Sequence, residues 1–216
     1  MGFKAIVAEI LGTFTLIFIG AGAVAVGIGG LLGAAGAHSL VVLGLIYTFG
    51  HHSGTHINPA VSFGLFVAGE FAVGKMVVYW VAQCIGGILG AAALYWILGG
   101  VGVNNLGATL PAEGVSIAQT IVLEAVLTFL LVNSIMNTAV SGRGGDFAPI
   151  AISATLAACI LMGGPLTGAS LNPARTLGPA LFTGTLRMFW VYVVGTFVGA
   201  AAAGLLYRGV LKEAGR

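Results

Sequence analysis

Apolar residues are concentrated in six long segments of this 216-residue chain, and polar residues are largely confined to the connections between them. The apolar segments run roughly over residues 3–29, 37–50, 74–98, 117–140, 147–163 and 186–209. About 20 predominantly apolar residues in a helix suffice to cross the hydrocarbon core of a bilayer, which is about 30 Å thick. The pattern therefore predicts an all-α membrane protein with six transmembrane helices.

Two of the connections, residues 51–69 and 164–185, are too apolar for ordinary loops and too short to span a membrane. Each begins with a Gly-rich polar stretch and continues as a short helical pattern, at 59–67 and at 173–182. A proline at the first helical position, after an Asn that can cap, marks the start of a helix. Two such helices of about 15 Å, placed tip to tip, would reach about 30 Å. We therefore expect two re-entrant half-helices that meet at mid-membrane.

The two halves of the chain resemble each other in three places, in the same order and at nearly constant spacing. Residues 8–14 match 123–129, residues 53–61 match 167–175, and Tyr-x2-Ala-Gln-x2-Gly from Tyr79 matches Tyr-x2-Gly-Thr-x2-Gly from Tyr192. Each copy holds three spans, so the second enters the membrane from the opposite side and the repeats are inverted. We predict one membrane domain over 1–216, with repeat one at about 1–98, a linker loop at about 99–116 and repeat two at about 117–210.

Composition agrees with a surface that faces lipid. Only 6% of the residues are charged, against about 25% in an average soluble domain. The formal net charge of +2, without any basic run, predicts no nucleic-acid partner. Cys84 and Cys159 lie inside apolar segments without a ligand-spacing motif and are interpreted as packing residues. The sequence shows no nucleophile–base arrangement and no cofactor fingerprint, so we expect neither an enzyme nor a bound cofactor.

The basic residues predict the orientation in the membrane, because loops on the cytoplasmic side carry the excess of Lys and Arg. With both termini cytoplasmic, one side holds Lys4, Lys75, Arg143, Arg208, Lys212 and Arg216, and the other holds Arg187. We therefore expect a multi-pass protein of the plasma or inner membrane with both termini in the cytoplasm.

The most informative motif is an Asn-Pro-Ala triplet that occurs twice, as Asn58-Pro59-Ala60 and as Asn172-Pro173-Ala174. Non-helical backbone at membrane depth is tolerated only where it is buried in protein or lines a polar cavity. Each Asn can cap its half-helix and still direct an amide donor into such a cavity. A single Asn-Pro is an ordinary turn signal, but two copies at equivalent positions of inverted repeats favour a polar path through the membrane.

Three charged residues within the apolar regions are candidates for function. Arg175 follows the second triplet, and a charge at membrane depth is a functional hypothesis by default. Glu9 and Glu124 occupy equivalent repeat positions. They could carry protons or ions in a coupled transporter, or they could accept backbone hydrogen bonds from the adjacent re-entrant loops, which we favour.

The four histidines lie between residues 38 and 56. No Cys or acidic residue joins them in the sequence, so we predict no metal site. His56, two residues before Asn58, is expected to orient the first re-entrant loop or to face the pore entrance.

The stretch from Ser53 to Val61, together with Asn172-Pro173-Ala174-Arg175, resembles the signature loops of the aquaporin (major intrinsic protein) family. The resemblance covers essentially the whole chain. It implies a right-handed bundle of six helices and two half-helices, a homotetramer with one pore in each subunit, and donation from both triplet Asn side chains to a file of water. It also implies a constriction at four positions, which map here to His38, Ile160, Ala169 and Arg175.

These four residues differ from those of water-specific members of the family, which have Phe and His at the first two positions. His38 is similar to the vacuolar plant branch, whose members often pass ammonia, urea or peroxide, and Ile160 also resembles archaeal members. Glycerol facilitators usually have Asp directly after the Arg, and this chain has Thr176. We therefore expect a passive channel for water, with ammonia or other small neutral solutes as further permeants, that excludes protons and ions. The alternatives are a glycerol or small-polyol facilitator and, less favoured, a coupled secondary transporter.

Overall fold

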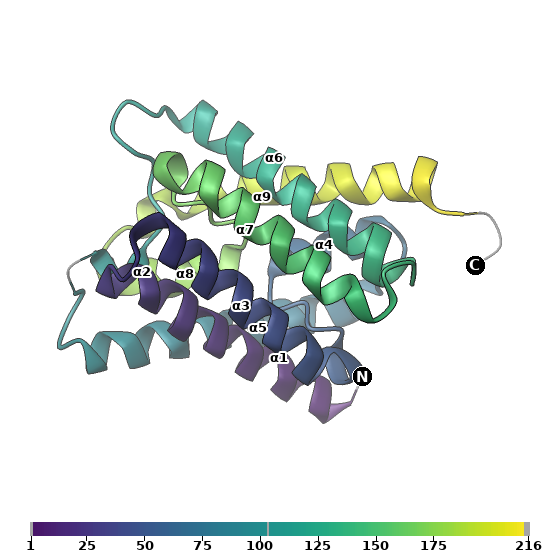
Figure 1. Ribbon diagram of the computed structural model, residues 1–216, viewed down its shortest axis with the longest axis horizontal. Coiled ribbons are helices and arrows are strands. Elements are labelled where there is room, and N and C mark those ends of the chain that lie inside the picture. The colour runs from purple at the N-terminus through teal and green to yellow at the C-terminus, as the bar shows by residue number, and fades with distance from the viewer. Residues whose placement is uncertain (1, 103, 214–216) are drawn as a thin grey trace.

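The computed structural model describes residues 2–102 and 104–213. Some residues used in the predictions lie outside this range. They are the first and last residues of the predicted domain, 1 and 216, the second of which is the Arg216 used to predict the orientation, and residue 103 of the predicted linker. Within the described part the secondary structure is helical and contains no strand. Six segments are long and apolar enough to cross a membrane, namely Phe3–Val26, Gly30–Ser53, Val73–Ile97, Ile117–Val140, Gly145–Thr167 and Leu186–Leu211. The prediction of an all-α protein with six transmembrane helices is confirmed (Figure 1).

The helices of the two halves follow the same order. The first half contains α1 (Phe3–Leu16), continued by the π-helical turn η1 (Ile17–Ala21) and α2 (Gly22–Val26), then α3 (Gly30–Ser53), the half-helix α4 (Pro59–Val67) and α5 (Val73–Ile97). The short 3-10 turn η2 (Asn105–Gly107) lies in the linker. The second half contains α6 (Ile117–Ile135) with η3 (Met136–Val140), η4 (Gly145–Phe147) leading into α7 (Ala148–Thr167), the half-helix α8 (Pro173–Thr183), and η5 (Leu186–Met188), α9 (Phe189–Leu206) and η6 (Tyr207–Leu211).

The largest differences from the predicted limits lie at two glycine- or proline-containing helix ends. The helix α3 begins at Gly30 and not near residue 37. Its first two turns contain Leu31 and Leu32, but glycines at 30, 33 and 36 interrupt the apolar run by which the span was recognised. The helix α7 continues to Thr167 and not 163, with Pro165 accommodated within its last turn. A proline removes one backbone donor, and neighbouring elements in membrane proteins can satisfy the carbonyl that is freed. The half-helices match the prediction, with α8 one residue longer.

Helix packing follows the repeat. The helix α1 packs on α5, α6 packs on α9, and α3 meets α7. A Cβ added at Gly86 on α5 would lie 2.3 Å from the Ile10 carbonyl oxygen, and one at Gly199 on α9 would lie 2.1 Å from that of Ala125. These contacts occupy equivalent positions in the two repeats. Small residues of this kind let helix backbones approach closely in lipid. An equivalent glycine contact therefore packs two helices together in each half of the bundle.

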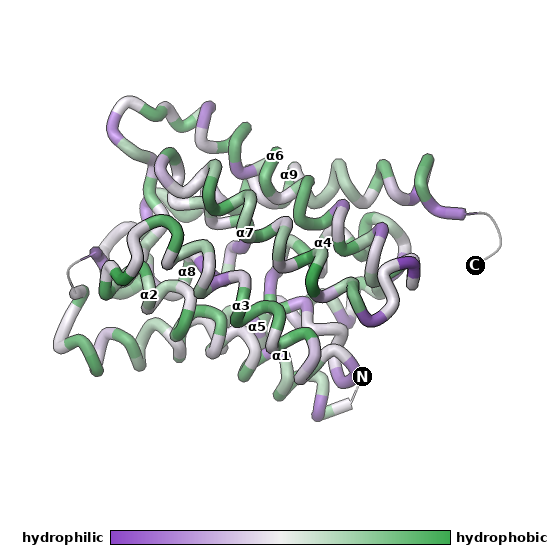
Figure 2. Tube along the Cα trace, viewed as in Figure 1, coloured by the Kyte–Doolittle hydropathy of each residue, from purple (hydrophilic) through white to green (hydrophobic). Residues whose placement is uncertain are grey.

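The start of α1 and the end of η6 point to the same side of the bundle, which we call the terminal side (Figure 1). The opposite side, which carries the connection between α5 and α6, is called the linker side. Apolar side chains on the outward helix faces are exposed, including Leu32, Trp96 and Val210. Figure 2 shows that apolar residues extend along the whole length of the outer helices. An exposed apolar surface of this extent is expected of a multi-pass membrane protein.

Candidate functional site

The two half-helices begin at the triplet asparagines and are capped in the same way. The Asn58 Oδ1 atom accepts a hydrogen bond from the Ala60 amide at 2.9 Å, and Asn172 Oδ1 accepts one from Ala174 at 3.0 Å. Both asparagines have extended backbone conformations and are followed by a proline at the first helical position. The local sequence therefore starts each helix where it was predicted, because Asn supplies the cap and Pro needs no donor there.

The same two side chains join the half-helices to each other. Asn58 Nδ2 donates to the Leu171 carbonyl oxygen at 2.8 Å, and Asn172 Nδ2 donates to that of Ile57 at 2.9 Å. Each amide group has two N–H donors, so one remains on each asparagine for a further acceptor. The two triplets predicted to meet thus lie in contact, related by the inverted repeat.

The loop before each half-helix has an unusual backbone. Thr55 and Ile57 have φ of 50° and 43°, and Ala169 and Leu171 have φ of 43° and 53°. Left-handed conformations are uncommon for residues other than glycine and asparagine, and the surrounding structure must hold them in place. The alternation is the same in both loops, and the residues of both loops line one cavity.

Glu9 and Glu124 hold these loops. The Glu9 carboxylate accepts hydrogen bonds from the His56 and Ile57 amides at 2.9 and 2.7 Å. The Glu124 carboxylate accepts from the Ser170 and Leu171 amides at 3.0 and 2.9 Å. Both side chains are 0% exposed. Each carboxylate therefore satisfies two backbone donors at membrane depth, where an unsatisfied donor is costly.

Further polar side chains support the two carboxylates. Ser53 Oγ and Gln83 Nε2 donate to Glu9, both at 2.7 Å, and Thr167 Oγ1 donates to Glu124 at 2.8 Å. Their roles were not predicted from the sequence, although all three lie in the matched repeat segments. His56 lines the same cavity as the other residues of the first loop. Its Nδ1 atom lies 2.9 Å from Ser62 Oγ, and its ring packs against Phe71 and Tyr79.

A cavity of about 250 Å³ extends from the two re-entrant loops toward the terminal side, where Ala139 and Val140 line it. A second cavity of about 340 Å³ opens on the linker side, where Asn104 and Gly107 line it. The two cavities have four lining residues in common, namely His38, Ile160, Ala169 and Arg175. These are the four residues that the family resemblance assigned to a constriction, and the fold brings them together from α3, α7, the second loop and α8.

Two of these four residues have buried polar atoms without a protein partner. His38 Nδ1 lies 2.8 Å from the Ala34 carbonyl oxygen, to which it must donate, whereas Nε2 is buried and unpaired. Arg175 Nη1 donates to the Gly107 carbonyl oxygen at 2.6 Å, and Nε is buried and unpaired. Buried polar atoms normally have partners, and these two have none. His38 Nε2 is an unpaired acceptor that lies close to Gly20 of η1, where a Cβ would come within 2.7 Å of it, and Arg175 Nε is an unpaired donor.

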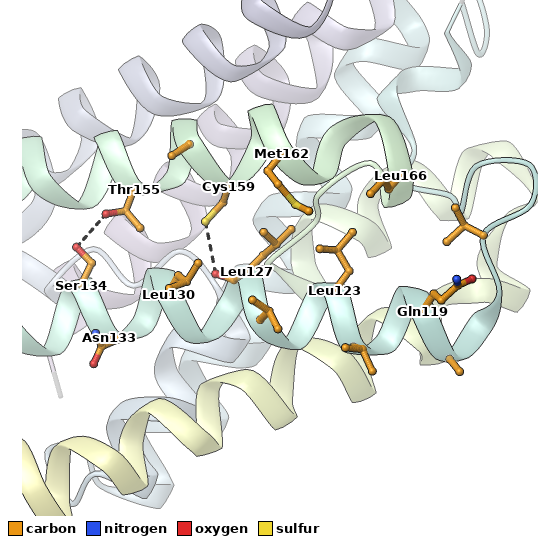
Figure 3. Close-up of a pocket in the computed structure, with 15 residues that line it drawn as sticks. Gln119, Leu123, Leu127, Leu130, Asn133, Ser134, Thr155, Cys159, Met162 and Leu166 are labelled. Carbon is orange, nitrogen blue, oxygen red and sulfur yellow. Dashed lines mark hydrogen bonds between the residues drawn. The ribbon is translucent and has the colours of Figure 1, made fainter.

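A hollow of about 1080 Å³ forms a groove on the outside of the bundle between α6 and α7 (Figure 3). Its walls are mainly aliphatic, such as Leu123, Leu130 and Met162, with Thr155 Oγ1 3.3 Å from Ser134 Oγ as a polar contact. None of its lining residues belongs to either re-entrant loop. The groove is therefore separate from the two cavities within the bundle.

Comparisons with known proteins agree with this geometry. Residues 1–207 match the family described as "Major intrinsic protein". The chain is 41% identical over 217 residues to aquaporin TIP1-2 of Zea mays, covering 94% of this chain and 84% of that one. It is 40% identical over 208 residues to aquaporin NIP1-1 of Oryza sativa subsp. japonica, covering 94% and 72%.

A solved structure is similar over almost its whole length. The aquaglyceroporin from Plasmodium falciparum has a TM-score of 0.85 and 27% identity, with 97% of this chain and 96% of that chain covered. Fold, paired re-entrant helices and sequence similarity agree. The chain belongs to the major intrinsic protein family, the family of the aquaporins.

Proposed function

We propose that the path through the two cavities is the pore of a passive channel, and that His38, Ile160, Ala169 and Arg175 select what passes. The chain is a passive channel for water and small solutes. The proposal for the pore rests on one observation. The two triplets are in contact in the first cavity and keep spare amide donors, and four shared lining residues connect this cavity to the second.

At the centre of the pore, Asn58 and Asn172 would each donate one N–H to a passing water molecule. The positive N-terminal ends of α4 and α8 meet at the same place. A water oxygen is favoured there, whereas a cation or hydronium ion meets two like-signed dipole ends in a region of low dielectric constant. We therefore propose that this centre excludes protons and cations and passes neutral molecules.

At the constriction, a molecule would meet an acceptor from His38 and donors from Arg175 across a small residue, Ala169. Ile160 makes a further wall apolar. Water satisfies both polar partners, and so does ammonia, which donates to a bare imidazole nitrogen and accepts from a guanidinium. We propose ammonia as the second permeant on this ground. The four positions were assigned from a resemblance to the aquaporin family, and several relatives of this chain are named as TIP aquaporins.

Two alternatives make different demands on the same site. A glycerol facilitator is suggested by the aquaglyceroporin structure, but Thr176 stands in place of the Asp that usually follows the Arg in that group. A coupled transporter would need a titratable group in the path. Glu9 and Glu124 are instead enclosed by loop donors, which supports a structural role.

We also propose a homotetramer with one pore in each subunit, in the plasma or inner membrane, with both termini cytoplasmic. The tetramer follows from the family resemblance, and the orientation follows from the distribution of basic residues. Native mass spectrometry of the detergent-solubilised protein tests the assembly. Protease cleavage at the termini in sealed right-side-out and inside-out vesicles tests the orientation.

The decisive experiment is stopped-flow light scattering on proteoliposomes with an osmotic step, followed by gradients of ammonia, urea and glycerol. The proposal expects a rise in water and ammonia permeability over empty vesicles. No rise in water permeability would overturn the pore. Glycerol permeability exceeding that of ammonia would favour the facilitator, and uptake that depends on a proton gradient would favour the coupled transporter.

A further inference from the structure

We infer that Thr109, a linker residue outside the re-entrant loops, positions the Arg175 guanidinium at the constriction through a chain of hydroxyl groups. The inference rests on the constriction proposed above. It concerns the linker between the repeats, whose sequence predicts only a connecting loop.

The linker enters the protein at one point and is anchored there. Leu106 is 0% exposed and belongs to the apolar core with Ile17, Ala21 and Leu94. Its φ of 51° is left-handed, as is that of Asn105 at 52°. A non-glycine residue keeps such a conformation only where its surroundings determine it. The buried Leu106 side chain holds this conformation, so the linker has a defined position against α2, α5 and α8.

The residue after this anchor contacts the constriction directly. The Gly107 carbonyl oxygen accepts the hydrogen bond from Arg175 Nη1 at 2.6 Å. A Cβ at residue 107 would lie 2.5 Å from the Ala21 carbonyl oxygen, so glycine is needed for this approach. Where the guanidinium lies therefore depends on where the linker holds this carbonyl.

Thr109, two residues after Gly107, connects the linker to α8. Its hydroxyl oxygen lies 2.9 Å from that of Thr176, the residue after Arg175. Thr109 is 2% exposed. It also packs against the start of the second re-entrant loop, since a Cβ at Gly168 would lie 3.0 Å from the Thr109 Cα atom. Two contacts therefore connect this part of α8 to the linker. Arg175 contacts Gly107, and the next residue, Thr176, contacts Thr109.

The hydroxyl chain continues from Thr176 to the second re-entrant loop. Ser170 Oγ lies 2.6 Å from Thr176 Oγ1 and 2.9 Å from the Asn172 carbonyl oxygen. Because a hydroxyl can both donate and accept, these contacts form a continuous chain from Thr109 to the residue that caps α8. The three residues that carry it, Thr109, Thr176 and Ser170, are buried.

Removal of the Thr109 hydroxyl would release the linker from α8 while leaving the Leu106 anchor in place. The Gly107 carbonyl would then no longer be held in register with Arg175, and the guanidinium would gain freedom to move into the linker-side cavity. A less restrained arginine leaves a wider opening. The consequence is a change in selectivity, expressed as the ratio of urea permeability to water permeability.

The test measures this ratio in proteoliposomes for Thr109→Val, Thr109→Ser and Thr176→Val, with two reference variants. Arg175→Ala reports the effect of removing the guanidinium. Thr196→Val is the matched control, because Thr196 is also buried but its hydroxyl bonds within its own helix α9. Both valine variants in the hydroxyl chain should raise the ratio by about three- to tenfold, the factor that corresponds to the loss of one net hydrogen bond. Thr109→Ser keeps the hydroxyl group and should have the same permeability ratio as the unaltered protein. Thr196→Val should also leave this ratio unchanged.

The outcomes separate this inference from the proposed constriction. If Arg175→Ala raises the ratio and Thr109→Val does not, Thr109 has no positioning role. If Arg175→Ala also leaves the ratio unchanged, the constriction itself is wrongly assigned. An equal effect of Thr196→Val, or failure of Thr109→Ser to restore the ratio, would mean that any loosening of the bundle suffices, and the inference would be rejected.

Discussion

Asn58 and Asn172, which are far apart in the chain, each donate a side-chain hydrogen bond to the carbonyl of the residue that precedes the other. The same two side chains cap α4 and α8 with their oxygen atoms. One pair of residues therefore starts two helices and joins them end to end. The remaining amide hydrogens are the donors that we propose face a molecule in the pore.

Replacing Asn58 by Asp should impair the exclusion of cations. The carboxylate keeps the capping acceptor but loses the amide donors, and it places a negative charge where the positive ends of two helices meet. We expect proton leak through the pore to increase and water permeability to fall. A pH-sensitive dye enclosed in proteoliposomes, together with stopped-flow scattering, measures both. Asn137→Asp, at a residue that lines neither pore cavity, is the control, and an equal leak in that variant would contradict the prediction.

Replacing Glu124 by Gln should destabilise the second re-entrant loop. The amide keeps the size of the side chain but leaves one acceptor atom where three donors now bind, namely Thr167 Oγ1 and the amides of Ser170 and Leu171. A buried donor without a partner costs about 1–3 kcal/mol. We expect a lower midpoint of thermal unfolding in detergent and reduced water permeability. An unchanged midpoint would show that the carboxylate does not support the loop.

The double substitution His38→Phe with Ile160→His should narrow the constriction. A larger ring replaces the His38 acceptor, and a polar ring replaces the apolar wall. We expect ammonia permeability to fall relative to water permeability, measured as the ratio of the two rates in the same vesicles. If the ratio stays at its original value, the two residues do not select the solute.

Replacing Gly199 by Ala should force α9 away from α6, because the added Cβ would lie 2.1 Å from the Ala125 carbonyl oxygen. Overpacking of this kind typically costs about 1–3 kcal/mol. Gly44→Ala on α3 is a matched control, since nothing lies within 4 Å of a Cβ there. The first variant should lower the thermal unfolding midpoint in detergent, and the second should leave it unchanged or raise it slightly, because Ala favours a helix over Gly. Equal midpoints would show that this contact does not limit packing.

Local sequence determined the elements of this protein. An apolar stretch long enough to cross a membrane forms a helix because no other structure satisfies its backbone in lipid. The six spans followed from this, and Asn followed by Pro marked the start of both α4 and α8. The repeat added the inverted arrangement, since an odd number of spans reverses the direction of the second copy. The limits of α3 and α7 were less predictable, because Gly, Ala and Pro carry little local signal for a span.

Tertiary structure decided which of these residues act together. His38, Ile160 and Arg175 lie on three different helices, and their positions around one opening were assigned from a family resemblance rather than from local pattern. Gln83 beneath Glu9 and Thr109 beside Thr176 were not predicted at all. Hydrogen bonds between distant segments depend on how helices cross and how closely glycines let them approach. Local sequence specifies the helices, but the separations between side chains on different helices arise only when the whole bundle packs.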